Sequence, residues 1–211
     1  MRFNTMIVET FIPILILFFS VILHECAHGW VAYKLGDPTA KEAGRLTLNP
    51  FKHIDPLGTV ILPGALWILR SLGYVNFVIG WAKPVPVNFL NLRNPKRDMM
   101  WVGLAGPGMN IILAIFFYQF LRFDLSYGYY KMLEEAVFLN LVLAVFNLTP
   151  IPPLDGSRFV SSLLPKKMAL AYSQLEAMGI LIVIILINLG LFEKIILPLV
   201  VLLGRIIGIE F

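Results

Sequence analysis

Long runs of apolar residues are the feature that most constrains this chain. A helix that spans a bilayer needs about 20 mostly apolar residues. Four segments meet this requirement: Met6–Tyr33, Met99–Leu121, Met132–Thr149 and Met168–Leu189. Over the whole sequence 58% of the residues are hydrophobic and 14% are charged, whereas soluble domains are about a quarter charged. Because such a chain cannot cover itself with polar surface, we expect a membrane protein whose apolar excess faces lipid.

Two further apolar segments are shorter or interrupted. Ile195–Ile209 could span only with local thinning of the bilayer or by packing on protein. Leu57–Leu72 contains Pro63 and Gly64 at its middle, and we expect it to dip into the membrane and return, or to lie at the interface. The predicted fold class is therefore an all-α polytopic membrane protein with about five spanning helices and one re-entrant or interfacial segment.

Two polar, turn-rich stretches separate the apolar segments. Leu35–Pro56 contains a predicted short strand at Arg45–Asn49, and Gly80–Asp98 contains another at Lys83–Asn88, whose prolines allow only an edge strand. Both stretches are basic, so by the positive-inside rule both belong to the cytoplasmic side. The loop Arg122–Lys131 carries fewer positive charges and would face outward.

The remaining composition limits the classes of protein. The formal charge of +4 is modest and the basic residues are scattered, which argues against nucleic-acid binding. The single cysteine, Cys26, excludes an intrachain disulfide. Since no linker or repeat divides the chain, we expect one membrane-embedded domain over residues 1–211, with a core at about 6–160 and additional C-terminal helices at 168–209.

The segment His24-Glu25-Cys26-Ala27-His28 lies near the end of the first predicted helix. Histidines four residues apart project from one helical face, about 6 Å apart along the axis, so both can reach one metal ion. Glu25 can then contact a metal-bound water without being a ligand, which is the H-E-x-x-H arrangement of zinc hydrolases. The alternative is a pair of interfacial histidines with a glutamate that reaches the headgroups. Ionisable residues in lipid are costly and usually functional, which favours the metal site.

A catalytic zinc site needs a third protein ligand and one open position. A third histidine six residues on is excluded, because that position is Lys34. Several nearby loop residues could serve, although loops of this composition carry such residues routinely: Asp37, Glu42, His53 and Asp55. We expect His53 to fix a loop rather than to bind metal, and Cys26 to pack between helices rather than to act as a fourth ligand.

Asp155 is the stronger candidate for the third ligand. It follows three prolines that cannot continue a helix and that leave backbone groups exposed where it stands: Pro150, Pro152 and Pro153. Irregular backbone at membrane depth is tolerated only against protein or water. By itself the pattern fits equally well a helix-terminating turn with a capping aspartate.

Together these motifs resemble the site-2 protease family of intramembrane metalloproteases. That family pairs H-E-x-x-H on one membrane helix with an N-x-x-P-x-P-x-L-D-G-like motif on a later one. The matching residues here are Asn147, Pro150, Pro152, Leu154, Asp155 and Gly156. The resemblance extends to Gly106–Asn110 and to the loops at 49–53 and 80–86, so it covers about 20–160. Many relatives carry an inserted peptide-binding domain or an added nucleotide-sensing domain, and this chain looks like a minimal member without either.

The resemblance implies a zinc protease that cuts in or near the transmembrane segments of membrane-anchored proteins, as in regulated intramembrane proteolysis. One Zn²⁺ would be held by His24, His28 and Asp155, with Glu25 as the base. Asn147 matches the family residue proposed to hydrogen-bond near the reacting carbonyl, although it could instead join helices by packing. Asn110 is expected to support helix packing and the ligands from behind.

Topology supports the same site. If the basic stretches are cytoplasmic, the helices that carry His24, Gly106–Asn110 and Asp155 bring all three to one level, near the cytoplasmic side of a multi-pass protein of the cell membrane. Two rival classes remain, a metal transporter or binding protein without hydrolysis, and an inactive scaffold. The chain has three histidines, all before residue 54, and a glutamate that metal binding does not need, which argues against transport. The substrate and the oligomeric state are left open.

Overall fold

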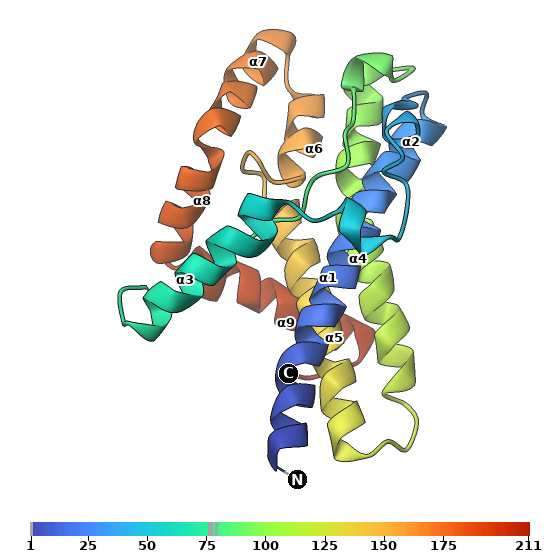
Figure 1. The fold of residues 1–211 in the computed structure, drawn as a ribbon. Helices are drawn as coiled ribbons and strands as arrows, with labels where there is room; N and C mark the ends of the chain where they lie inside the picture. The colour runs from blue at the N-terminus through green and yellow to red at the C-terminus, as the bar shows by residue number, and fades with distance from the viewer. Residues whose placement is uncertain (1, 76–77, 79) are drawn as a thin grey trace.

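Three helices form the centre of the molecule. The computed structural model describes residues 2–75, 78 and 80–211, with side chains from residue 12 onward. Helix α4 (Pro95–Phe120) packs against both α1 (Arg2–Lys34) and α5 (Tyr127–Leu148). In Figure 1, α1 and α5 run toward one end of the bundle and α4 runs back from it. The end of α1, the start of α4 and the end of α5 therefore lie at the same end.

Three helices are long and apolar enough to cross a membrane. They are Ile12–Lys34 within α1, the whole of α4, and Lys166–Asn188, which joins α7 (Lys166–Gln174), η4 (Leu175–Met178) and α8 (Gly179–Asn188). The predicted span Met132–Thr149 covers most of α5 and its C-terminal cap, and the first turns of α5 carry Lys131, Glu134 and Glu135. These charges shorten its apolar stretch. The protein is thus an all-helical membrane protein among its described residues, and the expected count of about five spans is not confirmed.

The C-terminal part packs against α5. The predicted short segment Ile195–Ile209 is built mainly from η5 (Phe192–Ile196) and α9 (Leu197–Ile207). Its buried residues join those of α4 and α5 in one apolar cluster: Ala114, Val137, Leu141, Val145, Ile196, Val200 and Ile209. Between membrane helices such contacts stabilise by close packing, because lipid is as apolar as the side chains that it would replace.

The segment predicted to be re-entrant or interfacial is a helix outside the bundle. It consists of η2 (Pro56–Ile61) and α3 (Leu62–Ser71), and none of the α3 residues is buried. In Figure 1, α3 extends sideways from the central helices. Its start is held by Asp55, whose carboxylate accepts a hydrogen bond from the Gly58 amide at 2.7 Å.

The two predicted edge strands do not form. The loops around them contain α2 (Thr39–Glu42), η1 (Pro50–Lys52) and η3 (Phe89–Asn91), but both Arg45–Asn49 and Lys83–Asn88 are irregular, and no described residue belongs to a strand. Proline has no amide hydrogen, so the prolines at 84 and 86 cannot donate to a ladder.

Most of the remaining amide donors of the second segment are already engaged. The Lys83 amide donates to the carbonyl of His53 at 2.9 Å, and the Val85 amide donates to the Glu25 carboxylate at 2.8 Å. These contacts hold the segment against the bundle as an extended but unpaired chain.

A short helix, α6 (Gly156–Leu163), follows the turn that carries Asp155. This proline-rich turn joins it to α5, and α6 packs against α4.

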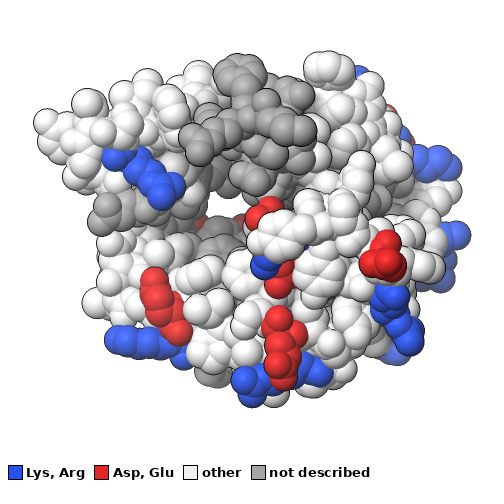
Figure 2. All heavy atoms as spheres, turned by 90° about the horizontal axis from the view of Figure 1, so that it is seen from below, with Lys and Arg blue, Asp and Glu red and all other residues white. Residues whose placement is uncertain are grey.

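The surface at the lower end of the bundle in Figure 1 is mostly uncharged. Basic and acidic side chains are scattered over it (Figure 2). The expectation of scattered rather than clustered charge therefore holds on this face.

Candidate metal centre

Two histidines of α1 point from the same face toward α4 and α5. His24 lies ten residues before the last residue of α1, which places it about 15 Å below the helix end at the usual rise per residue. His24 and His28 are 6% and 8% exposed, and their rings meet edge to face with centroids 4.7 Å apart. The centre therefore lies within a membrane-spanning helix and is shielded by protein.

Each histidine is oriented by a hydrogen bond at Nδ1. In His28, Nδ1 lies 2.6 Å from the backbone carbonyl oxygen of Val102 on α4. In His24, Nδ1 lies 2.5 Å from Oδ1 of Asn110, also on α4. Both partners are acceptors, so each Nδ1 carries the hydrogen. A neutral imidazole has only one N–H, which leaves Nε2 of both rings with a free electron pair.

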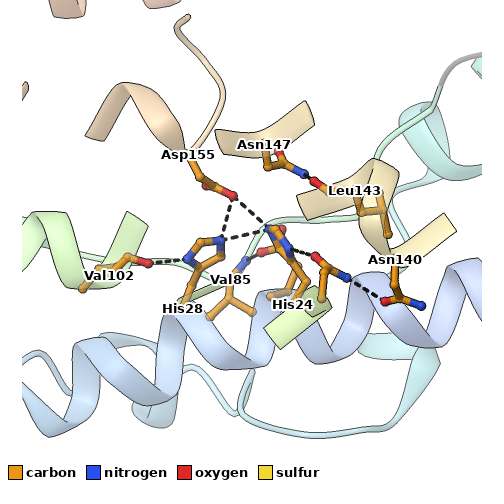
Figure 3. Close-up of polar contacts among 10 residues, drawn as sticks. His24, His28, Val85, Val102, Asn140, Leu143, Asn147 and Asp155 are labelled. Atoms are coloured by element: carbon orange, nitrogen blue, oxygen red, sulfur yellow. Dashed lines mark hydrogen bonds and ion pairs between the residues drawn. The ribbon is translucent and has the colours of Figure 1, made fainter. Parts of the chain in front are cut away.

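Asp155 reaches these nitrogens from the turn after α5. The turn is tight at Gly156, where an added Cβ would meet backbone atoms of Leu148 and would lie 2.7 Å from the carbonyl oxygen of Thr149. With this close approach, Oδ2 of Asp155 lies 3.0 Å from Nε2 of His24 and 3.2 Å from Nε2 of His28 (Figure 3). The two Nε2 atoms are themselves 3.1 Å apart.

This donor set fits a metal ion. Three electron-pair donors converge with no hydrogen between them, an arrangement that is repulsive unless a cation lies among them. Ligands of a tetrahedral zinc ion are separated by roughly 3.3 Å, given bonds of about 2.0–2.1 Å. The observed separations of 3.0–3.2 Å are close to that value. Two imidazoles and one carboxylate are also a ligand set known from catalytic zinc sites.

Gly106 lets α4 pass directly over the two rings. A Cβ atom at this position would lie 2.5 Å from Nε2 of His24 and would also meet Nε2 of His28. Any side chain here would therefore occupy the space between the ligand atoms. The close approach of α4 to the two histidines therefore requires glycine at position 106.

Glu25 is next to His24 in sequence but turns to another neighbour. Its Oε2 accepts the hydrogen bond from the Val85 amide, so the loop Lys83–Asn88 lies beside the metal centre. Asn147 donates from Nδ2 to the carbonyl oxygen of Leu143 within α5 at 3.0 Å. Figure 3 shows Asn147 on the same side of the site as Asp155.

The other candidate ligands lie elsewhere. Asp37 is fully buried and binds the loop that contains Asn88 and Asn91. Glu42 is exposed on α2, and Asp55 caps η2. His53 is fully buried and fixes a loop as expected, since its Nε2 lies 2.8 Å from the carbonyl oxygen of Thr47.

Cys26 is also outside the group. Its Sγ donates to the carbonyl of Thr47 at 3.3 Å. Among the described residues the one group of histidine, cysteine and acidic side chains that could hold a metal ion is His24, His28 and Asp155.

Several contributors escape sequence reasoning. Val85 and Val102 act through backbone atoms, for which side-chain identity gives no signal. Asn140 on α5 is fully buried and hydrogen-bonds Asn110 at 3.0 Å. The one available hint was a second amide inside the apolar run Met132–Thr149, in addition to Asn147, because a polar side chain in lipid is costly.

Fold and donor set together define a membrane-embedded metal-dependent hydrolase of the H-E-x-x-H type. A sequence model described as peptidase family M50 matches residues 12–137 and 124–189. This chain belongs to that family, the site-2 proteases, and is a zinc metallopeptidase.

Individual relatives are also named as zinc metalloproteases. A Bacillus subtilis protein named "Putative zinc metalloprotease YwhC" is 38% identical over 183 residues, which are 82% of this chain and 78% of the relative. The Mycolicibacterium smegmatis protein "Putative zinc metalloprotease Rip2" is 30% identical over 79% of this chain and 62% of its own length. A zinc metalloprotease of Methanocaldococcus jannaschii is 29% identical over 72% of this chain and 34% of its own length. No solved structure gives a significant match.

Proposed function

We propose that this metallopeptidase is an intramembrane protease that cuts membrane-anchored proteins in or near their transmembrane segments. One observation carries the proposal. Three converging electron-pair donors, from His24, His28 and Asp155, lie about 15 Å below the end of a membrane-spanning helix. A peptide bond could reach such a centre only from within or beside the bilayer. The partners would thus be a membrane-anchored protein substrate and the lipid around both proteins.

We further propose that the metal centre lies toward the cytoplasmic side of the membrane. From the last residue of α1 to the first turn of α4, and apart from α3, the chain carries eight basic residues: Lys34, Lys41, Arg45, Lys52, Lys83, Arg93, Lys96 and Arg97. The loop at the other end of α4, between Phe120 and Tyr127, carries Arg122 alone as a basic residue. By the positive-inside rule this asymmetry supports a cytoplasmic position for the end nearer the metal centre.

The residues of the chain would divide the chemistry as follows. His24, His28 and Asp155 would hold one zinc ion, which when bound supplies a Lewis acid for the scissile carbonyl and an acidic water. Glu25 would accept the proton of the attacking water on the carboxylate oxygen that Val85 leaves free, and would return it to the leaving amine. The Val85 amide would keep that carboxylate in one orientation.

Asn147 would assist at the substrate. One of its two amide hydrogens is used by Leu143, so the other remains to donate toward the carbonyl at which negative charge develops. Its position beside Asp155 supports this role (Figure 3).

The test compares the purified protein with its Glu25→Gln variant. Zinc is measured by elemental analysis, and cleavage is measured on a single-span substrate labelled at both ends, so that product size gives the depth of the cut. We expect about one zinc per chain in both proteins and cleavage by the wild type alone. Glu42→Gln, which changes an exposed glutamate on α2, is the matched control and should cut normally.

The other outcomes are informative. Zinc without cleavage by the wild type would favour a metal-binding scaffold or transporter. Loss of zinc in Glu25→Gln would mean that Glu25 is a ligand. Cleavage only in soluble loops would overturn the intramembrane assignment.

A further inference from the structure

A chain of buried polar side chains lies behind His24 and joins the three central helices. Ser20 of α1, Asn110 of α4 and Asn140 of α5 are 2%, 0% and 0% exposed. Nδ2 of Asn110 donates to Oδ1 of Asn140 at 3.0 Å, and Nδ2 of Asn140 donates to Oγ of Ser20 at 3.0 Å. Figure 3 shows Asn140 on the far side of His24 from Asp155. In lipid, side chains of this kind are rare and usually functional.

The polarity of this chain is fixed at its far end by a backbone group. Nδ2 of Asn140 also lies 2.9 Å from the carbonyl oxygen of Ala136, one turn earlier in α5. A carbonyl oxygen can only accept, so the amide nitrogen of Asn140 must be on that side and its oxygen must face Asn110. Ser20 has a hydroxyl that can donate or accept, and therefore fixes nothing.

The consequence passes through Asn110 to the metal ligand. Because an oxygen of Asn140 faces it, Asn110 must present its NH₂ group there and its own oxygen to His24. That oxygen accepts from Nδ1 of His24, which keeps the hydrogen on Nδ1 and the electron pair on Nε2. If Asn110 were flipped, its NH₂ group would face Nδ1, and the favoured tautomer would carry its hydrogen on Nε2, where the metal must bind.

We propose that Asn140 is a positioning residue for metal binding, which sets the orientation of the Asn110 amide and through it the tautomer of His24. The inference rests on the proposed role of His24 as a zinc ligand. Partners behind a metal-binding histidine typically change metal affinity by about 10–100-fold. Here the partner of the histidine is the amide of Asn110, whose oxygen and NH₂ group can exchange places by rotation. A second residue is therefore needed to fix its orientation.

The first experiment measures zinc affinity by competition with a chelator. Asn140→Leu, which has a similar volume and no polar group, should weaken zinc binding by about 10–100-fold. It should also change the visible spectrum of the cobalt(II)-substituted protein, which reports ligand geometry. Ser20→Ala is the matched control, because it removes an equally buried hydrogen bond to Asn140 but leaves Ala136 in place. It should bind zinc within about twofold of the wild type.

A double-mutant cycle separates this role from simple helix packing. In an Asn110→Leu background the connection to His24 is already absent, so adding Asn140→Leu should not weaken zinc binding further. If Asn140 only joins helices, Asn140→Leu should weaken binding by the same factor in both backgrounds, which would overturn the proposal. Where leucine disturbs folding, Asn140→Ser, too short to reach Asn110, replaces it in the same cycle.

Failure of this inference is distinguishable from failure of the proposed function. If the wild type binds zinc and Asn140→Leu binds it equally well, the proposed role of Asn140 is wrong and the metal site stands. If the wild type binds no zinc, the metal site itself is wrong, and so is the proposed role of Asn140.

Discussion

The backbone amide of Val85 lies 2.8 Å from Oε2 of Glu25, 60 residues earlier in the chain. Val85 stands between Pro84 and Pro86, which have no amide hydrogen. Its amide is therefore the one donor at residues 84–86 and cannot be replaced by a shift of one residue in either direction. One carboxylate oxygen of Glu25 is held by this bond, an arrangement that suits the proposed role of Glu25 as a general base.

Replacing Val85 by proline should slow cleavage without removing zinc. The substitution deletes the amide hydrogen and frees the Glu25 carboxylate to rotate. Misplacement of a catalytic group by about 1 Å can cost about 100-fold in rate, so we expect a loss of about 10–100-fold in kcat. Val87→Pro is the control, because the Val87 amide donates to no described residue. An equal loss in both variants would mean that the loop is merely deformed.

Gly106→Ala should abolish metal binding. The new methyl group would lie 2.5 Å from Nε2 of His24, within the space of the ion, so we expect zinc affinity to fall by more than about 100-fold. The control is Gly108→Ala, two residues further along α4. A Cβ atom at position 108 would have no neighbouring atom within 4 Å. That variant should bind zinc normally and be more stable by up to about 1 kcal/mol, as alanine is the better helix former. Normal zinc binding by Gly106→Ala would show that the histidines meet the ion elsewhere.

Asp37 should make the fold sensitive to acid. Burial raises the pKa of its carboxyl, but hydrogen bonds from Thr39, Asn91 and the Asn88 amide outweigh burial and leave the pKa below its ordinary value. A lower pKa in the folded state means that ionised Asp37 stabilises the fold above the unfolded value of about 4. This contribution is lost as the pH falls through the folded-state value.

The measurement is thermal unfolding in detergent as a function of pH. Near neutral pH, Asp37→Asn should lower the free energy of unfolding by about 1–3 kcal/mol, because it removes a charged acceptor that several donors share. The difference from the wild type should shrink as the pH falls below about 4. A difference that does not depend on pH would show that ionisation of Asp37 contributes nothing.

His53→Ala should weaken the loops and spare the metal centre. The ring of His53 contacts the Thr47 carbonyl within the first loop, and the backbone carbonyl of residue 53 accepts from the Lys83 amide of the second loop. The ring therefore supports the loop that holds the second one. Loss of the buried ring should cost about 1–3 kcal/mol of stability and lower activity. Zinc content should stay at the wild-type level, measured on protein purified at low temperature. A zinc-free variant would revive His53 as a ligand.

Local periodicity was enough to predict much of this protein. The apolar runs identified α1, α4 and the segment Lys166–Asn188, because membrane helices follow from composition over about 20 residues. The spacing of His24 and His28 placed both rings on one face, since a helix has 3.6 residues per turn. Both inferences depend on one continuous segment of the chain, which a sequence displays directly.

The choice of a third ligand was different. From the residues alone Asp155 was a stronger candidate than Asp37 or Asp55, because it follows a proline-rich turn and the predicted helices bring it level with the histidines. Its pattern fitted a capping aspartate equally well, and the resemblance to a family favoured the ligand. The tertiary structure separates them, with Asp155 against the histidines, Asp37 within a loop and Asp55 at a helix start. Distance along the chain does not encode which aspartate returns to α1, because that depends on how α5 packs.

The sequence by itself thus determined an all-helical membrane chain with two histidines and a glutamate on one helix. Only the tertiary structure decided that Val85 orients the glutamate, that Asn140 lies behind His24 through Asn110, and that the two expected strands stay unpaired. The physical reason is that these relationships join groups far apart in the chain. The bond from Val85 to Glu25 also uses a backbone amide, which every residue type except proline carries alike.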